Sequence, residues 1–118
     1  MITEDYVSFE TAKLLNEKGM NKSCFKHYVQ KNNNDGTSEA VTVCTLQMAM
    51  KWLREVHKII PIILTGEYSQ KPLYYWFRID TIIEGKLKDA IYREDEKEYS
   101  SYEEACEAAI KYCLENLI

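Results

Sequence analysis

Cysteine and histidine are the side chains of this sequence best suited to metal binding or nucleophilic chemistry. The chain has four cysteines and two histidines, and only Cys24 and His27 stand as a close pair, with Cys44 further along. A structural zinc site takes four ligands, which usually come as two such pairs. Because the second pair is missing, the sequence predicts no metal site and no cofactor.

Nucleophilic catalysis needs a thiol or hydroxyl within reach of a base. In a strand, Cys24 and His27 point to opposite faces and do not meet. His57 lies on the apolar side of a helix near its end, where a histidine usually packs or meets the helix dipole. Cys106 and Cys113 lie on the buried side of the last helix as small core residues. No phosphate-binding loop, dinucleotide fingerprint or GxSxG motif occurs, so we expect no catalytic residue and no enzymatic activity.

Composition and charge place the chain among ordinary globular proteins. Of its 118 residues, 46% are apolar and 29% are charged, and two prolines and four glycines leave little room for a linker. One domain over residues 1–118 is therefore expected. The net charge of −4 argues against general nucleic-acid binding. Neither a signal peptide nor an apolar run of about 20 residues occurs, which predicts a soluble cytoplasmic protein with reduced thiols and no membrane partner.

The stretch from Thr45 to Lys58 is the clearest amphipathic helix, and the other elements are expected to cover it. Thr45 is a good N-cap, because its hydroxyl can accept a hydrogen bond from a backbone N–H in the first turn. At about 100° per residue, the apolar side chains gather on one arc that we expect in the core. The residues of this arc are Leu46, Ala49, Met50, Trp52, Leu53, Val56 and His57.

Two further helices are predicted near the ends of the sequence. The first covers residues 8–18, with Ser8 as N-cap, Gly19 as the left-handed residue after its end, and Ala12 and Leu15 toward the core. The last covers residues 101–116 and opens with a capping box between Ser101 and Glu104. Its expected buried stripe consists of Tyr102, Ala105, Cys106, Ala109, Ile110, Tyr112, Cys113 and Leu117.

Residues 59–68, 73–83 and 87–93 are predicted to form an antiparallel meander, with a turn at residues 84–86. Pro61 lacks a backbone N–H, which favours either an edge strand or a place among the first residues of a strand. Side chains of the second strand alternate between two faces. One face, expected in the core, holds Leu73, Tyr75, Phe77, Ile79 and Thr81; the other, expected to be semi-exposed, holds Tyr74, Trp76, Arg78, Asp80 and Ile82.

Residues 24–44 have two interpretations. Residues 24–30 alternate as a strand does, residues 40–44 would form a short return strand, and Asp35-Gly36 suits a tight hairpin turn. Alternatively, the Asn-rich stretch 31–38 is a mobile surface loop. In either case the order of elements predicts an α+β fold: a single domain with an antiparallel three- to five-stranded sheet and three helices mainly on one face.

The semi-exposed face of the second strand is the first candidate binding surface. Tyr74, Trp76, Arg78 and Ile82 have the composition of a protein interface, which would serve self-association or the binding of a host or phage protein. The alternative is that the N-terminal hairpin folds over this face. A nucleic-acid binder is the second hypothesis. It would use Lys51, Arg54 and Lys58, the cations on the polar side of the central helix.

Three sequence blocks carry a resemblance: VSFETAKLLNEKG at 7–19, TLQMAMKWLREVHKI at 45–59 and SYEEACEAAIKYCLENLI at 101–118. They resemble a family of short uncharacterised prophage and mobile-element proteins, which share a TLxxAxKWLRExH-like middle box and a C-terminal YEEAxEAAIxxxLxxI helix. Cys44 stands where such proteins commonly have a proline. The resemblance implies a phage-derived soluble protein, and it implies no assigned activity and no catalytic residues. We therefore expect a small phage-type accessory protein that acts by protein–protein interaction without catalysis.

Overall fold

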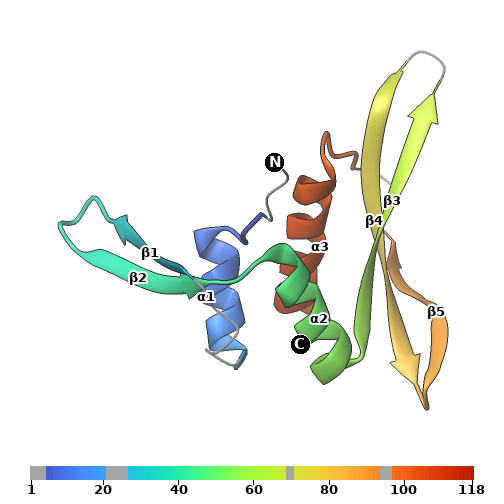
Figure 1. Cartoon of the computed structure of the whole chain (residues 1–118), viewed down its shortest axis with the longest axis horizontal. Helices are drawn as coiled ribbons and strands as arrows, with labels where there is room; N and C mark the ends of the chain where they lie inside the picture. The colour runs from blue at the N-terminus through green and yellow to red at the C-terminus, as the bar shows by residue number, and fades with distance from the viewer. Residues whose placement is uncertain (1–4, 21–26, 69–70, 94–96) are drawn as a thin grey trace.

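A layer of helices separates a long antiparallel sheet from a smaller β-hairpin (Figure 1). The structure is a computed structural model that describes residues 5–20, 27–68, 71–93 and 97–118. The predicted order of elements is confirmed. Its helices are α1 (Phe9–Glu17), α2 (Leu46–His57) and α3 (Tyr102–Asn116), and its strands are β1 (His27–Asn32), β2 (Ser38–Val43), β3 (Ile59–Tyr68), β4 (Lys71–Ile83) and β5 (Lys86–Arg93).

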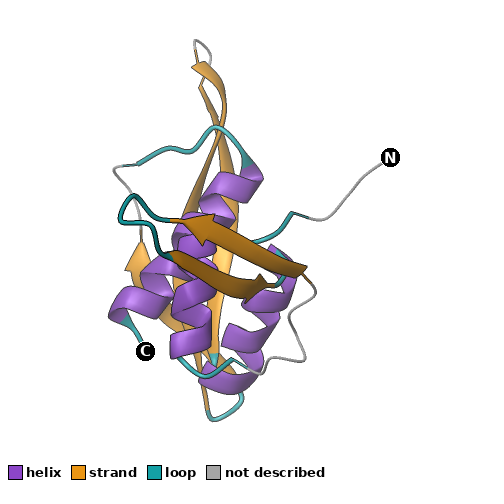
Figure 2. Cartoon of the chain, turned by 90° about the vertical axis from the view of Figure 1, so that its left-hand side faces the viewer, coloured by secondary structure: helices purple, strands orange, loops and turns teal. Residues whose placement is uncertain are grey.

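In the part of the chain that the structure describes, β3, β4 and β5 form one antiparallel sheet with β4 in the centre, and β1 pairs only with β2. The α+β class is confirmed, and so is the placement of the helices on one face of the main sheet (Figures 1 and 2). β3 is an edge strand, one of the two placements that Pro61 favours. The meander has three strands, the lower end of the expected range, because the N-terminal hairpin forms a sheet of its own within the described residues.

The N-terminal hairpin does not cover the second face of the main sheet. It lies beyond α1, on the other side of the helix layer (Figures 1 and 2). Its contacts with α1 include two exposed ion pairs, Lys13–Glu39 at 2.9 Å and Lys31–Glu10 at 3.1 Å. Packing on this helix directs the hairpin away from β4, so the hypothesis that it folds over the aromatic face is wrong.

The Asn-rich stretch forms an ordered hairpin turn. Asp35 Oδ1 accepts hydrogen bonds from the backbone N–H (2.9 Å) and the hydroxyl (2.6 Å) of Thr37, and the backbone N–H of Asn33 donates to the carbonyl of Thr37 at 2.8 Å. These bonds from Thr37 lower the pKa of Asp35 below its ordinary value. Asn32 pairs with Ser38, so the connection is longer than the expected Asp35-Gly36 turn. Residues 24–26 of the predicted strand lie outside the described residues.

Each described helix begins at its predicted N-cap. Thr11 donates its backbone N–H to the Ser8 hydroxyl at 3.2 Å, and the same bond at 3.1 Å joins Met48 to Thr45 and Glu104 to Ser101. The capping box of α3 is only half confirmed. The Glu104 carboxylate accepts from the backbone N–H and hydroxyl of Ser100, one residue before the cap, in place of the expected bond from Ser101.

Replacing Thr45 with alanine is expected to lower the free energy of unfolding by about 1 kcal/mol, because the Met48 N–H loses its acceptor at 3.1 Å. Thr45→Ser keeps the hydroxyl and is the matched control, with an expected loss of less than about half that amount. Chemical denaturation of the three proteins measures the difference. Equal losses from the two substitutions would mean that the methyl group, and not the cap, stabilises this position.

The core lies between the helices and the first face of the main sheet. On α2 the buried residues are Leu46, Ala49, Trp52 and Leu53, as the apolar arc predicted, but Val56 is 59% exposed. The prediction that Val56 is buried is wrong. Val56 lies in the last turn of α2, where the apolar arc of the helix extends past the elements that cover it. There Lys58 adopts a left-handed conformation (φ 59°) and the chain turns directly into β3.

The buried surface of α3 is wider than a stripe. Leu114 is fully buried although the sequence pattern omitted it, and Tyr102, expected in the core, is 37% exposed. The helix is contacted by α1, by α2 and by the sheet strands β3 and β4. Side chains on more than one side of α3 therefore meet a neighbour. Its buried residues are Ala105, Cys106, Ala109, Ile110, Cys113 and Leu114.

The strand β4 is longer than the helix layer that covers it. Phe77 and Ile79 are 1% and 0% exposed, as predicted, whereas Leu73 is 52% exposed. Leu73 belongs to the core side by alternation, but it lies near the end of the β3–β4 hairpin, which projects past the helices (Figure 1). The radius of gyration is 15.6 Å, above the roughly 13 Å of a compact chain of this length. Both hairpins thus extend from the helix layer.

Candidate functional site

The second face of the main sheet is the candidate site, and we call it the outer face. Residues paired across an antiparallel ladder point to the same side of a sheet. Gly66 pairs with Tyr74, Leu64 with Trp76, Ile62 with Arg78 and Ile60 with Asp80, and Ile82 continues the alternation on β4. On β3 and β4, the outer face therefore consists of Ile60, Ile62, Leu64, Gly66, Tyr74, Trp76, Arg78, Asp80 and Ile82.

No described helix or strand lies over the outer face (Figures 1 and 2). The predicted interface residues Tyr74, Trp76, Arg78 and Ile82 are all half-buried, and the structure brings them together along one side of β4. Isoleucine and leucine from β3 surround them. On β3 and β4 this arrangement is a largely apolar patch with aromatic side chains and Arg78, the composition typical of a protein interface.

Gly66 leaves room for the aromatic ring of Tyr74 on the outer face. A Cβ atom at Gly66 would overlap with the ring of Tyr74, its cross-strand partner, so the ring lies directly over the glycine. An aromatic ring over a strand glycine covers backbone that is otherwise left bare. Sequence reasoning missed this contact, because the pairing of two particular residues depends on the register of β3 against β4.

Arg78 and Asp80 form an ion pair in the middle of the outer face. The Nε of Arg78 lies 3.3 Å from Oδ1 of Asp80, but the angle is unsuited to a hydrogen bond, and neither atom has a hydrogen-bond partner among the described residues. The Asp80 side chain is 4% exposed and that of Arg78 is 37% exposed. The expectation of a semi-exposed Asp80 is therefore wrong. An Arg-x-Asp pair within an aromatic strand was the signal that could have revealed it.

The cations of the alternative hypothesis lie on the helix layer. Lys51 and Arg54 of α2 are exposed, and so is Lys58, the C-cap residue that follows this helix. Arg54 Nε lies 3.9 Å from a carboxylate oxygen of Glu55, and Lys58 donates its ammonium group to the Glu55 carbonyl at 3.0 Å. Lys58 thus stabilises the end of its own helix. Glu55 places a negative charge beside the three cations, which reduces the positive potential of this surface.

The described cysteines are packed in the core, and His57 is half-buried. Cys44, Cys106 and Cys113 are buried as free thiols, and the Cys106 sulfur lies 3.7 Å from that of Met50. His57 packs edge-on against Trp52 with ring centroids 4.6 Å apart. Among residues 5–20, 27–68, 71–93 and 97–118, no group of three metal-binding side chains occurs. Cys24 of the sequence pair lies outside these ranges.

Burial raises the pKa of Cys106 to about 11 and that of Cys113 to about 12, from an ordinary thiol value of 9.0. Because both pKa values are higher in the folded state, the thiol forms favour folding below about pH 9. This contribution is lost progressively as the pH rises through about 11 to 12.

Both thiols should therefore resist alkylation by iodoacetamide at pH 9, where an unfolded thiol is about half ionised. Labelling of a Cys24→Ser variant, followed by mass spectrometry, measures the rate at each described cysteine. The matched reference is the same variant in denaturant, where fast labelling is expected. Equally fast labelling of Cys106 in the folded protein contradicts its burial.

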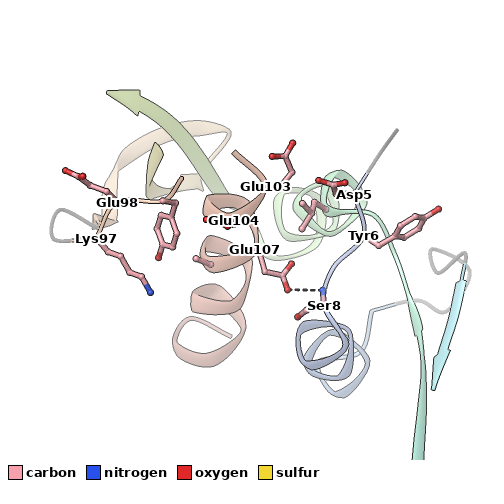
Figure 3. A pocket seen from close by; sticks show the side chains of 11 residues that line it. Asp5, Tyr6, Ser8, Lys97, Glu98, Glu103, Glu104 and Glu107 are labelled. Carbon is pink, nitrogen blue, oxygen red and sulfur yellow. Dashed lines mark hydrogen bonds between the residues drawn. The ribbon is translucent and has the colours of Figure 1, made fainter. Parts of the chain in front are cut away.

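A pocket of about 680 Å³ opens near the start of α3 (Figure 3). Segments 5–8 and 97–99 and the first turns of α3 form its walls. Glu107 accepts the backbone N–H of Ser8 at 2.9 Å, and Glu104 accepts from Ser100. Negative charge in the first turns of α3 also complements the helix dipole. The pocket is lined by five acidic residues: Asp5, Glu98, Glu103, Glu104 and Glu107. The hydrogen bonds of Glu104 and Glu107, and the position of Glu103 and Glu104 in the first turn of α3, give these acidic residues a structural role.

The described helices include none that is both long and apolar enough to cross a membrane. Comparison of the chain with protein-family models, curated proteins and solved structures finds no match. The fold and site define a small α+β protein with helices on one side of its sheet and an apolar, aromatic outer face on the other.

Proposed function

We propose that this chain is a small phage-type accessory protein that binds another protein through its outer face, with no catalysis of its own. The observation that carries the proposal is the sheet face itself. Helices cover one side of β3 and β4, and no described element covers the other (Figure 1). Its resemblance to prophage and mobile-element proteins in the three sequence blocks supports the phage-type part of the proposal.

The composition of the outer face supports an energetic role in binding. Tryptophan, tyrosine and arginine are the residue types that most often dominate the free energy of protein–protein association. Tyr74, Trp76 and Arg78 lie on one side of β4, and the arginine side chain is 37% exposed. Their half-buried state keeps them ordered in the free protein, which reduces the entropy lost on binding.

Site-specific photo-crosslinking tests this function. A photoreactive phenylalanine analogue replaces Trp76 in one variant and Val56 in the other, and both are irradiated in cells. Val56 is the matched control, because it is an apolar residue that is 59% exposed on the helix layer. A discrete protein adduct from position 76 and none from position 56 is expected. No adduct from position 76, or the same adducts from both, contradicts the proposal.

Nucleic-acid binding is the alternative, favoured by the three exposed cations of α2. If Lys51, Arg54 and Lys58 contact phosphates, the logarithm of the binding constant falls with the logarithm of salt concentration with a slope of about −3. Titration of an oligonucleotide at several salt concentrations, with Arg54→Glu as the comparison, measures that slope. Binding that is lost in Arg54→Glu supports the alternative, and no binding at low salt excludes it.

A further inference from the structure

The strand β3 forms a free edge of the main sheet, since within the described residues it pairs only with β4. In an antiparallel ladder, every second residue directs both its N–H and its carbonyl toward the neighbouring strand. The backbone N–H of Ile82 donates to the Lys58 carbonyl at 2.9 Å, so the even-numbered residues of β3 bond to β4 in the observed register. The residues whose backbone polar groups point outward are therefore Ile59, Pro61, Ile63 and Thr65.

Hydrogen bonds on the other side of β4 confirm this alternation. Tyr75 and Tyr99 exchange two backbone hydrogen bonds of 2.9 and 2.8 Å, so the odd-numbered residues of β4 bond away from β3. Pro61 fits the same alternation, because a proline nitrogen that points outward costs β3 no bond to β4. The described residues provide no hydrogen-bond partner for the backbone N–H of Ile63 or Thr65, and Thr65 is exposed.

The outward groups of β3 fit an extended polypeptide backbone, because a second strand supplies donors and acceptors at the same spacing. Edge strands are usually protected from such pairing by charged side chains, proline or bulges. In β3, Pro61 lies on one side of the outward pair Ile63 and Thr65, and a ladder irregularity between Gly66 and Tyr68 lies on the other. No residue from 59 to 66 is charged. The unprotected part of the edge is therefore residues 62–65.

This part of the edge is complementary to itself. In an antiparallel pair of two β3 strands related by a two-fold axis through Leu64, Ile63 of each copy lies opposite Thr65 of the other. The four N–H groups of these residues can then donate to their four carbonyls. An axis through Ile63 would place Pro61 opposite Thr65, and the Thr65 carbonyl would have no donor. The backbone therefore favours the axis at Leu64.

The helix layer is compatible with this arrangement. It covers the start of β3, where Ile59 is 7% exposed, but Thr65 is exposed and Leu73 of β4 is 52% exposed. A two-fold axis through Leu64, perpendicular to the sheet, places the two helix layers on the same side of the joined sheet and at opposite ends. The end of each β3–β4 hairpin projects past its own helices (Figure 1) and then lies beside the helix-covered start of the partner's β3.

We propose that β3 pairs with β3 of a second copy of this chain, antiparallel about Leu64, so that two three-stranded sheets join into one. The inference goes beyond the proposed function, because it uses the edge of the sheet and not its outer face. The contact is closed, since both copies use the same surface. Two short edge segments bury less than the about 800 Å² per partner of a standard interface, so we expect a dimer that dissociates on dilution.

Disulfide trapping tests the register of this dimer. In a Cys24→Ser background, Leu64→Cys places two thiols opposite each other in a non-hydrogen-bonded pair, with Cα atoms about 4.5 Å apart, a distance that a disulfide spans. Oxidised glutathione is the oxidant, and it leaves as two molecules of reduced glutathione. Ile62→Cys is the matched control on the same half-buried face, because its two copies would lie about 13 Å apart.

Leu64→Cys is expected to form covalent dimer at least about tenfold faster than Ile62→Cys, because its two thiols meet without backbone movement. The described native cysteines are buried and serve as an internal reference for background oxidation. Equal rates from the two variants, or no covalent dimer from Leu64→Cys, overturns the inference.

Size-exclusion chromatography with light scattering, from about 1 µM to about 1 mM, measures the association without a covalent bond. Wild-type protein is expected to rise from the monomer mass of 13.9 kDa toward twice that mass. Thr65→Pro removes an outward N–H and is expected to weaken the dimer at least about tenfold. Thr65→Ala keeps the N–H and is expected to dimerise like the wild type. A wild-type chain that stays monomeric throughout, or a folded Thr65→Pro variant that dimerises like the wild type, contradicts the proposal.

Discussion

Replacement of Phe77 by alanine is expected to lower the free energy of unfolding by about 3–5 kcal/mol. The Phe77 ring is 1% exposed and packs against Tyr92 and Tyr99, with ring centroids 5.9 Å and 6.1 Å away. Tyr92 in turn stacks on Tyr112 of α3, with ring centroids 3.7 Å apart. Phe77 therefore belongs to a cluster of aromatic rings that joins the sheet to the last helix. Its removal leaves a cavity that the surrounding rings cannot fill without moving.

Trp76→Ala is the matched control for Phe77. It removes a larger side chain from the next residue of β4, but from the outer face, where the side chain is half-buried. A loss of less than about 2 kcal/mol is therefore expected. Urea denaturation of the two variants measures both values. A Trp76 loss equal to that of Phe77 would show that the chain buries both faces of β4, which contradicts an exposed outer face.

Leu53→Ala is the second large effect, with an expected loss of about 2–5 kcal/mol. Leu53 is 0% exposed in the middle of α2, a helix that contacts β3 and α3. Val56 lies three residues along the same helix, yet it is 59% exposed. Val56→Ala is therefore expected to change the stability by less than about 0.5 kcal/mol.

The contrast between Leu53 and Val56 fixes how α2 is turned toward the sheet. Thermal or chemical denaturation of the two single variants is sufficient to measure it. Similar losses at both positions would mean that the apolar arc is covered along its whole length. A loss at Val56 greater than that at Leu53 would mean that α2 is rotated about its axis.

The elements of the fold could be predicted from the sequence because their signals are local. The caps at Ser8, Thr45 and Ser101 and the alternation of residues 73–83 each depend on neighbours in the chain. Burial depends on where an element ends relative to its neighbours, and local patterns do not contain that information. Leu73 and Val56 are exposed for this reason, since each lies past the end of its cover. Leu114 is buried because α3 has neighbours on more than one side.

The sequence predicts which residues form the candidate site, but it does not predict how far each of them is buried. Alternation alone places Tyr74, Trp76, Arg78 and Ile82 on one face. The burial of Asp80 and the contact of Tyr74 with Gly66 need the register of β3 against β4. Prediction of the acidic pocket would also require knowledge of a long-range contact. Tyr99, which lines the pocket, is held in place by its pairing with Tyr75 of β4.

The two candidate binding surfaces can be tested independently. The outer face lies on one side of the main sheet, while Lys51, Arg54 and Lys58 belong to the helix layer on the other (Figure 1). A charge reversal on either surface leaves the other unchanged, since side chains this far apart rarely couple. Arg78→Glu and Arg54→Glu therefore separate protein binding from nucleic-acid binding with the same change in net charge.

The exposure of Trp76 in the free protein is the most direct test of the outer face. Trp52→Phe leaves Trp76 as the remaining tryptophan, and Trp76→Phe leaves Trp52, which is 9% exposed. Acrylamide quenching of the two variants in dilute solution compares the indoles. Stronger quenching of Trp76 than of Trp52 is expected. Quenching of Trp76 as weak as that of Trp52 in dilute solution would mean that the chain covers this face itself, and an interface there would be excluded.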